Sequence, residues 1–337
     1  MSKKVIAKKE QEDKKDNKKL LILILLLLFL CLSLGLYTYA WFSSNKNALI
    51  DTIDINVQTV TGLQVSEDAI NWDNDITREE LINAYKTYPR AENQLPDTLA
   101  GVSSALGVTN GKLDIFYGLI SEEGYNKYSI QAVPQEEINC VGDEDCVDKH
   151  YVAFDIFLLT TTPADIGITA ESFVRPQEGA QDKGSQNAAR VGFVIEGSVG
   201  PTASLAAQNL KSNNKALLWE PNYDRHTEFG VQAAKNVYGI TTTTSGAARI
   251  PYKGINQPFS EHVLLTETRN SPYFTTVNPT VATTETFANN QALMRIPAGI
   301  TKVRIYLWLE GQDYDCEDNS SGGSISFNLS FTLNERD

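Results

Sequence analysis

Histidine, cysteine and methionine are scarce in this chain of 337 residues, which contains three, four and two of them. The histidines are His150, His226 and His262, and no HExxH or HxH arrangement occurs. A zinc hydrolase needs at least two closely spaced ligands, so we interpret all three as ordinary surface histidines. The GxSxG and glycine-rich phosphate-loop motifs are also missing. The sequence offers no candidate catalytic residue of a known motif, and we predict that the protein is not an enzyme.

Positive charge is scarce outside the first 19 residues, which hold eight lysines and four acidic residues. The chain carries −13 in total, so the remaining residues carry −17. A domain this acidic is repelled by the phosphate backbone of nucleic acids, and we expect no nucleic-acid partner. The same charge suits a soluble exterior domain and attracts divalent cations.

One long hydrophobic run is present, at residues 20–39, and it contains no charged residue. About 20 apolar residues in a helix span a membrane, whereas the apolar core of a signal peptide is shorter. The lysine-rich side of such a helix stays in the cytoplasm. We therefore expect a cytoplasmic arm at 1–19, a transmembrane or signal-anchor helix at 20–40 that contacts the membrane, and an extracellular domain at 41–337.

Period-2 alternation of apolar and polar residues dominates the predicted exterior domain, most clearly at residues 324–333. Such strands place one face on a core and the other in water. We predict a mainly β fold, an antiparallel β-sandwich with two short helices at 77–89 and 201–213. Long Thr- and Asn-rich segments, notably 176–188 and 213–258, are expected to be exposed loops or edge strands. The predicted strands are 53–60, 112–120, 151–161, 166–174, 190–197, 303–309 and 324–333.

Three of the four cysteines follow the hydrophobic run, and the fourth, Cys31, lies within it. Cys140 and Cys146 close a short loop, which predicts a disulfide in an oxidising exterior. Pairing of Cys316 with either of them is an alternative. Metal binding by the three is less favoured because no CxxC spacing occurs.

Acidic clusters are the candidate cation sites, although none matches the twelve-residue calcium loop. The weak calcium candidates are Asp313, Asp315, Glu317 and Asp318 in the segment 311–323. Two further clusters contain Asp143, Glu144, Asp145 and Asp148, and Asp73, Asn74 and Asp75. The alternative interpretation is that these are solvated loops, and no other cofactor is expected. Glu196 and Glu310 are considered as a carboxylate pair of a glycosidase, against the simpler interpretation that each ends a strand.

The N-terminal pattern of lysines, leucine-rich core, "TYAWFSSN" and the strand "IDINVQT" resembles secreted Gram-positive surface proteins of the TasA/camelysin type, which a SipW-like signal peptidase processes. The similarity is close over about the first 75 residues, and the rest resembles uncharacterised surface proteins. It implies a jelly-roll-like sandwich, cleavage between Ala40 and Trp41, and a matrix or fibre subunit whose N-terminal strand joins a neighbouring subunit. The metalloprotease activity ascribed to camelysin is not implied, because its motif is missing here. Alternatively, Trp41 anchors an uncleaved helix at the membrane interface.

Three functions follow from these observations. The first is a structural or adhesive cell-surface protein that self-associates or binds other surface proteins, tethered to the membrane or released. The second is an extracellular module that binds a carbohydrate or a peptide, with Trp72, Trp219 and Trp308 as platforms. The third is a surface hydrolase whose site is not recognisable.

Overall fold

The computed structural model describes residues 48–57, 62–120, 128–135, 139–146, 150–238, 250–256, 263–265, 273–277, 292–316 and 320–335. The chain divides into two units, 1–40 and 41–337, and all of these residues belong to the second. The predicted arm, the apolar run and the pair Ala40 and Trp41 lie outside them. Among the described residues, no helix combines the length and the hydropathy that crossing a membrane requires.

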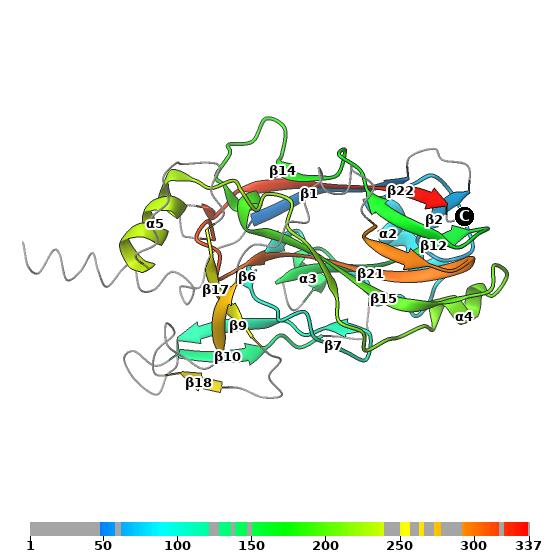
Figure 1. Cartoon of the computed structure of the whole chain (residues 1–337), viewed down its shortest axis with the longest axis horizontal. Coiled ribbons are helices and arrows are strands. Elements are labelled where there is room, and N and C mark those ends of the chain that lie inside the picture. The colour runs from blue at the N-terminus through cyan, green and yellow to red at the C-terminus, as the bar shows by residue number, and fades with distance from the viewer. Residues whose placement is uncertain are drawn as a thin grey trace, which may run out of the picture. The chain divides into compact units, whose positions relative to one another are not determined.

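Two large sheets contain the longest strands (Figure 1). In the seven-stranded sheet the order is β20 (Met294–Ile296), β13 (Ala164–Ile168), β22 (Ser324–Glu335), β1 (Ala48–Val57) and β3 (Asp75–Thr77), with β14 (Phe173–Pro176) beside β22 and β5 (Thr98–Leu99) beside β1. In the eight-stranded sheet it is β11 (Cys140–Val141), β4 (Gln94–Leu95), β12 (Tyr151–Thr160), β21 (Gly299–Glu310), β15 (Ala189–Val199) and β16 (Leu217–Trp219), with β2 (Leu63–Ser66) beside β12 and β6 (Gly101–Val102) beside β21.

The main hydrophobic core lies between these two sheets. Alternate residues of β1 and β22 contribute to it from one sheet, and alternate residues of β12, β15 and β21 from the other. The rings of Phe193 and Phe331 meet across the interface with centroids 6.4 Å apart. A period of two residues is what places one set of side chains on one face of a strand, and the prediction of a mainly β fold is confirmed.

The predicted antiparallel pairing is wrong at three places, because the sheets are mixed. β1 pairs in parallel with β22, in a register that joins Ile53 to Phe327 and Ile55 to Leu329. β6 with β21 and β4 with β11 are also parallel pairs. Parallel neighbours cannot be joined by a tight hairpin, and in each case the paired strands are distant in the sequence.

The helices differ from the prediction in number and length. α2 (Arg78–Asn83) has the predicted capping box of Thr77 and Glu80 and continues into the 3-10 turn η1 (Ala84–Lys86). The second predicted helix is only the short α4 (Ser204–Gln208). Three elements were not predicted: α3 (Gly142–Asp145), η2 (Ser185–Ala188) and α5 (Glu228–Tyr238). The prediction of exposed loops or edge strands at 213–258 is wrong for α5, but it agrees with β16 (Leu217–Trp219), which is an edge strand of the eight-stranded sheet.

Smaller elements cover the outer face of the eight-stranded sheet. They are β9 (Phe116–Ile120), β10 (Tyr128–Ala132) and β18 (Val263–Leu265), the pair β17 (Tyr252–Ile255) and β19 (Phe274–Val277), and the pair β7 (Val108–Thr109) and β8 (Lys112–Leu113). Leu113, Ile115 and Val133 pack there against Tyr306 and Trp308 of β21 in a second hydrophobic cluster. This sheet is therefore buried on both faces, and its outer face contains the candidate site.

Candidate functional site

The candidate site contains two charged side chains, Arg190 of β15 and Glu310 of β21. They follow Ala189 and Leu309, which pair with each other where the two strands are neighbours. Ala189 and Leu309 both point into the main core. Because successive side chains alternate between faces, Arg190 and Glu310 point to the outer face. They are 1% and 3% exposed, so both charged groups lie in a region from which water is largely excluded.

Arg190 is held by two carboxylates. Its Nε lies 2.7 Å from Glu220 Oε1, and its Nη2 lies 2.7 Å from Asp313 Oδ2. Its Nη1 donates to the carbonyl oxygens of Asn187 and Ala189 at 3.4 and 3.1 Å. Burial would lower the pKa of Arg190, but Glu220 and Asp313 raise it well above its ordinary value, so the guanidinium stays charged.

The turn after β21 attaches the N-terminus of α5 to the sheet. Asp315 pairs with His226 Nδ1 at 2.6 Å and accepts hydrogen bonds from the amide and hydroxyl of Thr227 at 2.7 and 2.8 Å. Thr227 Oγ1 in turn accepts from the amide of Gly230 at 2.9 Å, as a helix N-cap does. A Cβ atom on Gly230 would collide with Asp315 Oδ1, so glycine is needed for this close approach.

His226, Asp313 and Asp315 also have the spacing of a metal site, with ligand atoms within 4.8 Å of one another. All four carboxylate oxygens, however, have partners within the protein. Asp313 Oδ1 accepts from the amide of Asp315 at 2.9 Å, and Arg190 occupies the other oxygen. Calcium needs six to eight oxygen ligands and would have to displace these donors. The geometry fits attachment of α5 better than calcium binding, and Glu317 and Asp318 lie outside the described residues.

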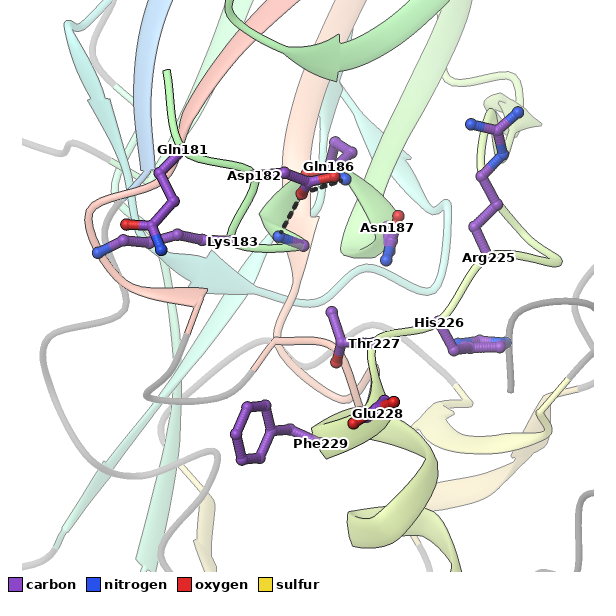
Figure 2. Close-up of a pocket in the computed structure, with 11 residues that line it drawn as sticks. Gln181, Asp182, Lys183, Gln186, Asn187, Arg225, His226, Thr227, Glu228 and Phe229 are labelled. Carbon is purple, nitrogen blue, oxygen red and sulfur yellow. Dashed lines mark hydrogen bonds between the residues drawn. The ribbon is translucent and has the colours of Figure 1, made fainter. Parts of the chain in front are cut away.

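An open cavity of about 770 Å³ lies beside the start of α5 (Figure 2). Most of the side chains that line it are polar, among them Gln181, Lys183, Arg225 and His226. Asp182 orders one side by accepting hydrogen bonds from the amide of Gly184 and from Gln186 Nε2 at 2.9 and 3.0 Å. Phe229 adds a ring that is 56% exposed. This combination of amides, charges and one exposed ring suits a polar ligand.

A second, smaller cavity of about 240 Å³ is lined by Arg190 and Glu310 together with Trp308, Tyr252, Leu106 and Ser103. Glu310 accepts hydrogen bonds from Trp308 Nε1 at 3.4 Å and from the amide of Gln312 at 3.2 Å. Burial raises the pKa of Glu310 to about 7. A perturbed acid in a cavity with aromatic walls is a typical feature of a binding site.

The alternative of a carboxylate pair formed by Glu196 and Glu310 does not fit the structure. The residue after Glu196, Gly197, pairs with Lys302, which is eight residues from Glu310 along β21. At about 3.3 Å per residue this separates the two glutamates by roughly 26 Å, against about 5–9.5 Å in glycosidases. Glu196 instead accepts a hydrogen bond from the amide of Ser212 at 2.6 Å.

The remaining acidic candidates do not converge on one point. Asp143 accepts hydrogen bonds from the amides of Asp97 and Thr98, both at 3.0 Å, and so fixes the start of β5. The other described members of these clusters are exposed, in agreement with solvated side chains, although α3 and β3 are not loops: Glu144 and Asp145 of α3, Asp73, Asn74, and Asp75 of β3. Asp148 lies outside the described residues.

The structure also tests the predictions made for the cysteines and the tryptophans. Cys140 and Cys146 form a disulfide with a Cα–Cα distance of 5.1 Å, and Cys316 is buried elsewhere. Trp219 and Trp308 are 0% and 1% exposed, so the prediction that they are surface platforms is wrong, while Trp72 is half-buried.

Two of the histidines are not surface residues. His150 is half-buried and stacks on Tyr117 with centroids 5.1 Å apart, and His226 has a buried side chain. The third, His262, lies outside the described residues.

Sequence reasoning missed Arg190, Glu220 and His226 as members of one cluster. A signal for the first existed: the outward positions of β15 that follow Arg190 are Gly192 and Val194, which is unusual for a face in water. Nothing in the sequence places Glu220 or His226 beside it. No protein-family model, curated protein or solved structure matches this chain.

Proposed function

We propose that the chain is a structural or adhesive cell-surface protein. In this proposal a helix at 20–40 holds it in the membrane, or cleavage between Ala40 and Trp41 releases it, and the mainly β domain, with a jelly-roll-like arrangement, lies outside. The observation that carries the proposal is the Cys140–Cys146 disulfide, because disulfides persist in oxidising exteriors. The uncharged run at 20–39 behind eight lysines supports the same location.

A structural role is supported by the position of β1. This strand has hydrogen-bonded neighbours on both edges, β22 on one and β3 and β5 on the other. Its inward residues Ala48, Ile50, Ile53 and Ile55 are buried. In this proposal, β1 leaves these partners in its own chain and makes the same main-chain hydrogen bonds in the sheet of a neighbouring copy, which would link subunits into fibres.

The test is to add an epitope tag after Asp337 and to measure antibody labelling on intact cells, with sedimentation of the native protein in parallel. We expect labelling without permeabilisation and particles larger than a monomer. Labelling that needs permeabilisation would refute the location. A monomer at all concentrations would refute assembly while leaving the location intact.

A second candidate function is binding of a carbohydrate or peptide, and the open cavity at α5 favours it (Figure 2). Ligand pockets combine apolar or aromatic surface with a few oriented polar groups. Here Phe229 supplies the ring, while Gln186 and Asn187 supply amides. Saturable binding by a monomer would favour this function over the first.

A further inference from the structure

Glu310 is a buried carboxylate that faces the smaller cavity and forms no direct ion pair with a described side chain. The nearby Arg190 is occupied by Glu220 and Asp313. Glu310 accepts hydrogen bonds from the amide of Gln312 at 3.2 Å and from Trp308 Nε1 at 3.4 Å, and the charge of Arg190 and the hydroxyl of Ser103 also favour its ionised form. Burying a charge without a partner is costly, so this carboxylate is a strong site for a cation.

The charges around the cavity add up to an excess of negative charge. Arg190 contributes one positive charge, and Glu220, Asp313 and Glu310 contribute three negative charges when ionised. The lysine that lines the cavity, Lys215, is exposed and therefore remains hydrated. An anion would be repelled by this environment, and a neutral apolar ligand would leave the carboxylate unpaired.

The walls of the cavity favour an organic cation over a metal ion. Trp308 and Tyr252 supply aromatic rings, and Leu106, Leu218 and Ile255 supply aliphatic surface. Tyr252 already faces one cation, because the guanidinium carbon of Arg190 lies 5.4 Å from the centroid of its ring. Aromatic faces attract ammonium groups, most strongly in desolvated sites. Calcium, by contrast, requires six to eight oxygens, which this lining does not bring together.

We propose that the cavity binds an ammonium group on a narrow alkyl chain, either a free alkylamine or a lysine side chain of a partner protein, with Glu310 as its counter-ion and Trp308 and Tyr252 as its walls. A volume of about 240 Å³ holds a short alkylammonium chain and lies below the roughly 300–1,000 Å³ of pockets for drug-sized ligands. The proposal does not rest on the location or the assembly proposed above, since described residues alone form the cavity.

Ammonium binding and protonation of Glu310 compete. Burial raises the pKa of Glu310 to about 7, so a proton neutralises the carboxyl group below that pH. The neighbouring groups that face it keep their charge state near neutrality. The pKa of Arg190 stays high because Glu220 and Asp313 adjoin it, although burial opposes this, and burial raises the pKa of Tyr252, which stays neutral. The affinity for an ammonium ion should therefore fall about tenfold per pH unit below about 7.

The experiment is calorimetry on the full-length protein in a non-ionic detergent, with n-butylammonium chloride, N-acetyl-lysine-methylamide and the neutral 1-butanol as probes. At pH 8 we expect the ammonium probes to bind at least tenfold more tightly than 1-butanol. Glu310→Gln should weaken their binding at least tenfold and abolish its pH dependence. Glu196→Gln is the matched control, because burial raises the pKa of Glu196 also to about 7, yet Glu196 lies on β15 beside the opposite end of β21 from Glu310. This control should bind as the wild type does.

Each outcome bears on the proposal. Binding of both ammonium probes supports a site for free amines as well, and binding of the lysine derivative alone supports a partner protein as the source. Absence of binding by both, equal binding of 1-butanol, or unchanged binding by Glu310→Gln would overturn it. A measurement that needs no variant is the melting temperature of the wild type, which butylammonium should raise at pH 8 and not at pH 5. An equal rise at both pH values would also overturn the proposal.

Discussion

Both faces of the eight-stranded sheet are buried, but one carries apolar side chains and the other carries charged and polar side chains. On β21, Val303, Ile305 and Leu307 point into the main core, whereas Arg304 and Tyr306 point outward, and all five are at most 5% exposed. The inner face is stabilised by apolar burial, which has no preferred direction. The outer face depends on ion pairs and hydrogen bonds that require particular partners. Alternation in a sequence therefore identifies residues that share a face, but it does not show whether that face is exposed to water.

The clearest outer-face network surrounds Asp155 on β12. Its carboxylate lies 3.2 Å from Lys302 Nζ and 3.0 Å from Arg304 Nη1, and it accepts a hydrogen bond of 3.0 Å from the hydroxyl of Tyr88. Burial would raise the pKa of Asp155, but Lys302 and Arg304 lower it to about 2. The cations and the anion thus depend on one another, since each is nearly inaccessible to water.

Replacing Asp155 by Asn is the change that we expect to have the largest effect. It leaves Lys302 and Arg304 buried without their counter-ion, which should reduce the free energy of unfolding by about 3–5 kcal/mol. Urea denaturation at pH 7 measures this loss. The exposed Asp75→Asn on β3 is the control and should change stability by less than about 0.5 kcal/mol.

Asp155→Asn also tests how the free energy of unfolding depends on pH. A carboxyl group whose pKa is lowered contributes stability above its unfolded value of 3.8 and loses it as the pH falls toward about 2. Asp155→Asn should therefore remove part of the acid sensitivity below pH 4. A loss of stability below about 1 kcal/mol at pH 7 would show that the outer network contributes little, and that the two faces differ less than we infer.

Glu310→Gln should act in the opposite direction. A carboxyl group whose pKa is raised from 4.5 to about 7 contributes stability below pH 4.5 and loses it as the pH rises through about 7. In the absence of an amine, the variant should be more stable than the wild type at pH 8 by up to about 3 kcal/mol, and equally stable at pH 4. Denaturation at the two pH values measures the difference. A variant no more stable at pH 8 would mean that Glu310 has a positive partner in the folded protein.

The inner face was largely predictable from the sequence, and the outer face was not. Ile325, Phe327 and Leu329 alternate with small polar residues, and this pattern alone placed them in a core. The same rule expects the opposite strand face, on which Asp155 and Arg304 lie, to be in water, because a strand pattern carries no information about covering loops. The elements that cover them come from residues 62–150 and 200–256, where short strands and buried polar residues leave no regular period.

The candidate site was only partly predictable for the same reason. Asp313 and Asp315 were selected because acidic residues cluster in the segment 311–323, and the structure does bring them together with a third potential ligand, His226. Their partners Arg190 and Thr227 are 123 and 88 residues distant in the chain. Such contacts depend on tertiary packing, which a single sequence does not reveal.

The smallest effects should come from the turn that joins the outer face to α5. Asp315→Asn keeps the shape of the side chain but weakens its pairing with His226, so it should reduce the free energy of unfolding by about 1–2 kcal/mol. Amide hydrogen exchange should accelerate in α5 and not in β15. Gly230→Ala, which forces a Cβ against Asp315 Oδ1, should accelerate exchange in the same helix. Uniform acceleration throughout the sheet would mean that the turn stabilises the whole domain and not only α5.

A calcium titration distinguishes two roles for this turn, attachment of Arg190 and α5 or binding of the ion. If Asp313 and Asp315 serve to hold Arg190 and α5, millimolar Ca²⁺ should leave the melting temperature unchanged, because no carboxylate oxygen is available without displacing a protein donor. A ligand that binds only the folded state must raise the melting temperature by mass action. If Ca²⁺ raises the melting temperature of the wild type, and the double substitution Asp313→Asn and Asp315→Asn removes this increase, these carboxylates bind the ion. The outer face would then resemble a cation site more than an internal network of protein charges.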